Sequence, residues 1–177
     1  ANYLRERGGV VVVAAGNTGA EKDIDASDAV LVVSATDQND ALAGFSSYGR
    51  FLDLAAPGAA IYTVDTGSSY AKRNGTSLAT PFVAAAAALV KAANPVLGAA
   101  DIESLLKTHS VDLGEPGEDS QFGAGRLDAA AAVAAALGAQ VQDSQPPVVA
   151  IISPAAGTSV TGLAEVAITS SDNVGVT

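Results

Sequence analysis

The sequence predicts a layered α/β domain with a mostly parallel sheet, followed by a linker and a short all-β segment. Residues 10–15 are a continuous apolar run without alternation, which is typical of parallel strands covered on both faces, and residues 29–35 repeat this pattern. Helical patterns alternate with strand patterns up to residue 138, which favours layers of helix on sheet. A polar, proline-bearing stretch at 140–147 then precedes two further strand patterns.

The first part of the domain alternates strands with turns. Residues 1–7 have the pattern of a helix end, which Gly8 and Gly9 close. The strand at 10–15 ends in the turn Gly16-Asn17-Thr18-Gly19. A serine-rich turn region covers 44–49, and Pro57-Gly58 is predicted to end the third strand. The four predicted strands are 10–15, 29–35, 51–55 and 61–64.

Three helices follow. The first is predicted over 76–93, and Pro81 is tolerated there because it falls in the first turns. The second is predicted over 101–108 with Asp101 as its N-cap. The third is predicted over 127–137, with Asp128 near its start and Gly138 as its stop.

The composition shift defines the domain organisation. We expect a first domain at 1–139, a linker at 140–147 and a second domain at 148–177. Within the last part, 148–152 and 165–169 have strand patterns, and Asp172-Asn173 is a turn signal. An immunoglobulin-type sandwich needs about seven strands, so this all-β segment is predicted to be truncated. A disordered extension rich in Thr and Ser is the alternative.

Composition excludes several function classes. The chain has 177 residues, 49% of them hydrophobic, and its 19 acidic against 9 basic side chains give a net charge of −10. So negative a surface disfavours nucleic acid and anionic membranes as partners. The absence of cysteine excludes disulfides, thiol catalysis and zinc-thiolate sites. The apolar run 84–90, which Lys91 follows, is too short for a membrane span, and the chain begins as if inside a helix, which suggests a piece of something longer.

Ser77 is the candidate nucleophile. It lies between Gly75 and the first turn of the 76–93 helix, where the helix dipole favours developing negative charge. An ordinary serine at a helix N-terminus is the alternative. His109, the chain's one histidine, comes after this serine, at the end of the 101–108 helix.

Several motifs in order resemble the subtilisin-like serine peptidases, the subtilases. Gly75-Thr76-Ser77-Leu78-Ala79-Thr80-Pro81 resembles the family's nucleophile motif, and Val12-Val13-Ala14-Ala15-Gly16-Asn17 the strand that leads to its oxyanion-hole asparagine. The intervening segments that also match are 33–37, 45–49 and 54–58, and 123–128 resembles the lead into the family's closing helix. The resemblance covers residues 1–138 and implies the C-terminal half of a subtilisin-like three-layer domain.

The resemblance assigns roles to four residues. Ser77 would attack a peptide carbonyl, and the Ser77 N–H and the Asn17 side chain would stabilise the oxyanion. Gly16 and Thr76 flank them as substrate-binding residues. The family order is Asp, His, Ser, so the base and its aspartate are expected before residue 1, His109 is not the base, and this chain alone is predicted to be inactive.

The resemblance also implies a cellular setting and partners. We expect a secreted, bacterial-type protein, extracellular or at the cell surface, that acts on proteins or peptides and needs the missing N-terminal half. The chemistry requires no cofactor and no metal, and no EF-hand spacing supports the structural calcium that the family admits. Four acidic residues after Asn17 form either a solvated loop or a pocket for a basic side chain. They are Glu21, Asp23, Asp25 and Asp28.

Two other functions stay open. One is a non-catalytic relative that keeps the scaffold for binding. The other is a cell-surface adhesion protein whose working part is the C-terminal segment, since residues 146–174 resemble bacterial Ig-like domains appended to secreted enzymes.

Overall fold

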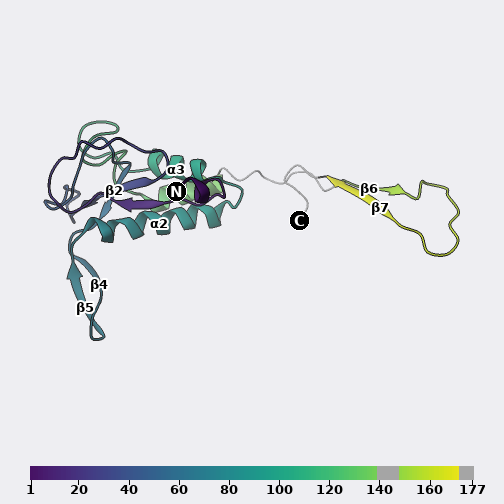
Figure 1. Cartoon of the computed structure of the whole chain (residues 1–177), viewed down its shortest axis with the longest axis horizontal. Helices are drawn as coiled ribbons and strands as arrows, with labels where there is room; N and C mark the ends of the chain where they lie inside the picture. The colour runs from purple at the N-terminus through teal and green to yellow at the C-terminus, as the bar shows by residue number, and fades with distance from the viewer. Residues whose placement is uncertain (139–147, 172–177) are drawn as a thin grey trace. The chain divides into compact units, whose positions relative to one another are not determined.

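The computed structural model describes residues 1–138 and 148–171 (Figure 1). The chain divides into two compact units, Ala1–Ala139 and Gln140–Thr177. The predicted linker at 140–147 and the predicted turn at Asp172-Asn173 lie outside the described residues.

A parallel sheet forms the centre of the first unit. It has three strands in the order β1 (Val12–Ala14), β2 (Leu31–Thr36) and β3 (Leu54–Pro57), all parallel, which confirms the predicted sheet type. β1 is shorter than the predicted 10–15 because its pairing with β2 begins only at Val12. β3 spans Leu54–Pro57 instead of the predicted 51–55, and Pro57, which was predicted to end the strand, is its last residue and opposes Thr36.

Helix α2 (Thr76–Ala93) packs across this sheet, in the range predicted for it. It contacts all three strands, and Figure 1 shows it running alongside them. Its buried side recurs at helical spacing, as expected of a helix that covers a sheet. The buried apolar residues of α2 are Ala79, Val83, Ala86, Ala87 and Val90.

Two shorter helices pack against α2 and correct two predicted boundaries. In α3 (Ala99–Thr108) the N-cap is Gly98, and Asp101 lies in the first turn, where its Oδ2 accepts a hydrogen bond from the Gly98 N–H at 2.9 Å. α4 (Ala129–Gly138) begins two residues later than predicted, because Asp128 Oδ1 accepts from the Ala131 N–H at 2.9 Å and so caps the helix. Gly138 is the last helical residue rather than the one after it.

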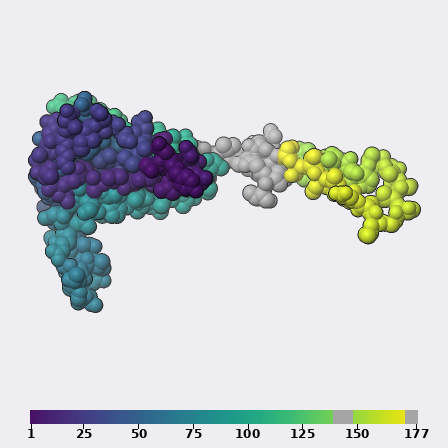
Figure 2. Space-filling view, in the orientation of Figure 1, coloured from purple at the N-terminus to yellow at the C-terminus, as the bar shows by residue number. Residues whose placement is uncertain are grey.

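A β-hairpin leads directly into α2. It pairs β4 (Ile61–Asp65) with β5 (Ser69–Arg73), and Figures 1 and 2 show it standing away from the body of the first unit. β5 is missing from the predicted elements, since its exposed residues give little apolar pattern. The turn residues Thr66-Gly67 were the available signal.

The N-terminal helix is fixed by one ion pair. α1 (Asn2–Arg5) is short, and Gly8, with φ of 79°, follows it as predicted for a helix end. The Arg5 guanidinium donates to the Glu103 carboxylate of α3, with Nε 3.1 Å from Oε1. This pair raises the pKa of Arg5, first through the hydrogen bond and then through the charge of Glu103.

The second unit holds two antiparallel strands, β6 (Val148–Ser153) and β7 (Ala167–Ser171). Both correspond to strands predicted there. Side chains on both faces of this ladder are exposed, with Val148 on one face and Ile151 and its partner Ile168 on the other. The immunoglobulin-type assignment of this segment stays a prediction.

By length and composition alone, α2 could cross a membrane. It has 18 residues with a mean hydropathy of 1.4, although the sequence had suggested no apolar run of that length. A core helix of a globular protein passes the same test, and α2 packs on all three strands of the sheet. Membranes as a partner are therefore not supported by this helix.

Gly58 allows the start of α2 to approach the sheet. A Cβ at this position would lie 2.6 Å from the Ala35 Cβ and 2.8 Å from the Gly75 carbonyl oxygen. We expect Gly58→Ala to lower the free energy of unfolding by about 1–3 kcal/mol, because neither neighbour can move without shifting backbone. Gly44→Ala is the matched control, since a Cβ there meets no atom within 4 Å. Urea denaturation of both variants measures the effect, and equal stabilities would contradict the steric explanation.

Candidate active site

Three segments converge where α2 begins. They are the turn after β1, the turn after β3 and the Gly75 turn itself. The Gly75 N–H donates to the Gly58 carbonyl at 2.9 Å, and the Leu78 N–H donates to the Gly75 carbonyl at 3.0 Å. Because the strands are parallel, their carboxyl ends lie at the same edge of the sheet, which is where ligands bind in such folds.

Thr76 ties the β1 turn to the helix. Its side chain is fully buried. Its hydroxyl accepts from the Gly16 N–H at 3.1 Å and donates to Asn17 Oδ1 at 2.9 Å. Its backbone N–H also donates to Asn17 Oδ1, at 2.8 Å. Two donors therefore hold the oxygen of the Asn17 amide, so its nitrogen is the end that is turned away from Thr76.

Ser77 and Asn17 border the same small space. A Cβ built on Gly75 would lie 3.0 Å from Ser77 Oγ and 3.6 Å from Asn17 Nδ2. Both residues are exposed, and within the described residues neither of these two atoms makes a hydrogen bond. Ser77 is the second residue of α2, so its backbone N–H also has no acceptor within the helix. A serine hydroxyl and two N–H donors thus meet at one solvent-facing point, as attack on a carbonyl requires.

His109 is occupied elsewhere. It is the C-cap of α3, and its Nδ1 lies 3.0 Å from the Leu105 carbonyl oxygen. A general base must be within hydrogen-bond reach of the serine hydroxyl, and no such partner of Ser77 occurs in the described part of the chain. Within the described residues the Ser77 hydroxyl and the neighbouring N–H donors therefore have no base beside them.

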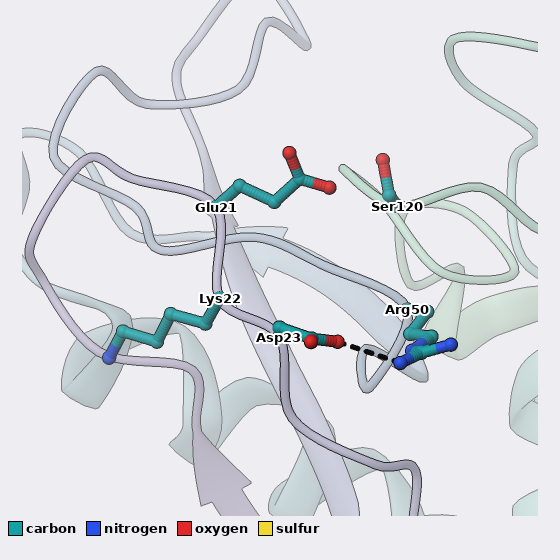
Figure 3. Close-up of a pocket in the computed structure, with 5 residues that line it drawn as sticks. All are labelled: Glu21, Lys22, Asp23, Arg50 and Ser120. Carbon is teal, nitrogen blue, oxygen red and sulfur yellow. Dashed lines mark hydrogen bonds and ion pairs between the residues drawn. The ribbon is translucent and has the colours of Figure 1, made fainter.

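The acidic loop after Asn17 is solvent-exposed. Glu21, Asp23, Asp25 and Asp28 all have exposed side chains. Asp23 Oδ1 pairs with the Arg50 guanidinium at 2.7 Å, and both line a surface pocket with Glu21, Lys22 and Ser120 (Figure 3). Exposure and this external ion pair are what a solvated loop predicts.

Lys22 also belongs to this loop, and the sequence patterns did not indicate it as a candidate site residue. It is one of the residues that line the pocket, and its side chain points away from Asp23 and Arg50 (Figure 3). A Cβ on Gly16 would lie 2.8 Å from Lys22 Nζ, so the ammonium group rests against Gly16. The available signal was that Lys22 is the one basic residue among the four acidic residues of this loop.

The described part of the chain offers no cluster of metal ligands. Within residues 1–138 and 148–171, no group of three or more His, Cys, Asp or Glu side chains is arranged to hold an ion. Asp53 accepts from the Val32 N–H at 2.8 Å and from Lys107 Nζ at 3.4 Å. Burial raises the pKa of Asp53, and these two partners oppose that rise. The Asp53 carboxylate, at the residue before β3, thus links this strand to β2 and α3.

Comparison with known proteins gives one consistent family. The family model described as Subtilase family matches residues 1–125. Subtilisin BL from Lederbergia lenta is 44% identical over 133 residues, which are 74% of this chain and 48% of that protein. The alkaline elastase YaB from a Bacillus strain is also 44% identical over 133 residues, but these are 34% of its length. The chain thus spans about half or less of the length of these relatives.

Solved structures agree with the sequence relatives. A protease from Pseudoalteromonas arctica PAMC 21717 superposes with a TM-score of 0.66 at 37% identity, over 76% of this chain and 45% of that one. A lanthipeptide protease superposes with a TM-score of 0.67 over 76% of this chain and 53% of its own. At 24% identity, the second likeness supports the fold alone.

Proposed function

The chain belongs to the subtilase family, and we propose that it is the nucleophile-bearing half of a secreted serine endopeptidase. The family match covers residues 1–125, and the relatives are subtilisins and alkaline proteases. Because the chain spans only part of each relative, the activity belongs to a catalytic domain completed by an N-terminal half. Proteins or peptides outside the cell are the proposed substrates.

The proposed reaction is peptide hydrolysis through an acyl-enzyme. Ser77 Oγ attacks the scissile carbonyl carbon and passes its proton to a base in the N-terminal half. The carbonyl π electrons move to oxygen, and the Asn17 amide and the Ser77 N–H donate to that oxyanion. Collapse of the intermediate breaks the C–N bond, the base protonates the leaving amine, and water then releases the acyl group from Ser77.

The arrangement of Asn17 is the observation that carries this proposal. Its Oδ1 is held by both the N–H and the hydroxyl of Thr76, at 2.8 and 2.9 Å. Its Nδ2 and Ser77 Oγ both adjoin the point where a Cβ of Gly75 would lie. An ordinary turn asparagine needs no such double anchor, whereas an oxyanion donor must be fixed before the charge develops.

An exposed apolar surface supports the need for an N-terminal half. One side of α2 is exposed although the helix is apolar all round, and such helices are normally buried. Phe82 is 43% and Leu89 55% exposed on that side. β1 is also at the end of the strand order, so within the described residues its outer edge is unpaired. Fluorophosphonate labelling of Ser77, with and without an added N-terminal half, tests the proposal.

The second unit is proposed to be part of an Ig-like domain that accompanies the protease. Its ladder β6–β7 exposes apolar side chains on both faces. A two-stranded ladder is marginal in water and needs further strands or a packing partner. This part has no role in the proposed chemistry.

Thr76→Val is expected to reduce kcat of the completed domain by about tenfold. Valine keeps the shape but removes the hydroxyl that bonds Gly16 and Asn17, and a lost hydrogen bond of this kind is worth about 1–1.5 kcal/mol. Peptide hydrolysis assays measure the change. Thr76→Ser keeps the hydroxyl and should retain most of the activity. Equal losses in both variants would contradict a role for the hydroxyl.

A further inference from the structure

We infer that Lys22 makes this site select an acidic side chain in the substrate residue whose carbonyl Ser77 attacks. The inference rests on the proposed function and names a substrate class for the same site. The Lys22 ammonium group lies against Gly16 and does not extend from the acidic loop into solvent. A Cβ at Gly16 would come within 2.8 Å of Lys22 Nζ.

Gly16 lies next to both the Lys22 ammonium group and the residues that would hold the reacting carbonyl. It immediately precedes Asn17, and its N–H is bound to the Thr76 hydroxyl at 3.1 Å, next to Ser77. Consecutive Cα atoms are about 3.8 Å apart, and a glutamate side chain reaches roughly that far again from its own Cα. A substrate carbonyl between Asn17 and Ser77 therefore places the side chain of its residue within reach of the Lys22 ammonium.

The acidic neighbours of Lys22 are directed elsewhere. In Figure 3 the side chain of Glu21 points to the opposite side from that of Lys22. Successive side chains of an extended segment alternate in this way, and Glu21 forms a parallel bridge with Tyr48. Asp23 is paired with Arg50 at 2.7 Å. The loop thus presents a positive charge at Gly16 although four of its residues are acidic.

The Lys22 ammonium also has no protein anion to bind. It is half-buried, and it makes no ion pair and no side-chain hydrogen bond within the described residues. Partial burial of a charge without a partner is unfavourable, and a substrate carboxylate would supply that partner. A fixed charge in a specificity pocket selects the opposite charge in the substrate.

Reporter peptides that differ only in Glu or Gln at the acyl-side residue test the inference. The enzyme is the complete catalytic domain, this chain together with its N-terminal half. We expect kcat/KM to be about tenfold higher for the Glu peptide, because its carboxylate gains a charge-assisted hydrogen bond to Lys22 that solvent access weakens. Lys22→Gln should bring the two rates close to equality, and Lys22→Arg should keep the preference.

Lys72→Gln is the matched control. Lys72 lies exposed on β5, and the substitution removes the same charge from the protein. A similar loss of preference in Lys72→Gln would assign the effect to the overall field and overturn a local role for Lys22. Equal cleavage of both peptides by the parent enzyme, with Ser77 still labelled by a fluorophosphonate, would overturn the inference alone. Absence of both cleavage and labelling would overturn the proposed function and the inference with it.

Discussion

Fluorophosphonate should label Ser77 on the order of 10⁶-fold more slowly in this chain alone than in the chain joined to its N-terminal half. This factor is the loss of turnover known from subtilisin when its triad is disabled. The slow labelling is expected because Ser77 lacks a base in the described part of the chain. Ser77 Oγ has no hydrogen-bond partner in the described residues, and His109 is bonded to the Leu105 carbonyl of its own helix. A hydroxyl without a base is a weak nucleophile at neutral pH.

The comparison needs two controls. Ser77→Ala should abolish labelling in both forms, which assigns the adduct to this residue. Leu89→Asp places a charge on the exposed side of α2 and should weaken complementation when the two halves are mixed as separate chains, because that side would be covered on assembly. Equal labelling rates with and without the N-terminal half would contradict the dependence that we propose.

Asn17→Leu should lower kcat of the completed domain by about 10²–10³-fold with little change in KM. This range is the one known for removal of the oxyanion donor in subtilisin itself and is taken over from it. Leucine has nearly the shape of asparagine but no N–H, so the oxyanion loses a donor while the space near Gly75 stays filled. Steady-state kinetics on a peptide substrate separates the two parameters.

Asn2→Leu is the matched control for this substitution. Asn2 is exposed in α1, which precedes β1 in the chain. The same change there should leave kcat unaltered. A fall in KM and kcat together at position 17, or an unchanged kcat, would contradict the assignment of Asn17 as a donor that acts in the transition state.

Local sequence patterns predicted the elements whose residues are buried. The sequence predicted β2 and α2 because their buried residues form a recognisable pattern, which is a mostly apolar run in β2 and helical spacing in α2. β5 was missed because its residues are mostly exposed, so no burial shaped their pattern. The start of α3 was misplaced because Asp101 bonds back to Gly98 from inside the first turn, and both positions favour the same residue types.

The sequence by itself determined the family and the identity of the proposed nucleophile, since Ser77 lies in an ordered series of motifs that the family model also matches. Only the tertiary structure decided how Asn17 is oriented and where the Lys22 charge lies. Asn17 is separated from Thr76 by 59 positions, and the contact exists because β1 ends and α2 begins at the same edge of the sheet. The direction of Lys22 depends on the space left by Gly16, and such space is a property of packing that residue order does not contain.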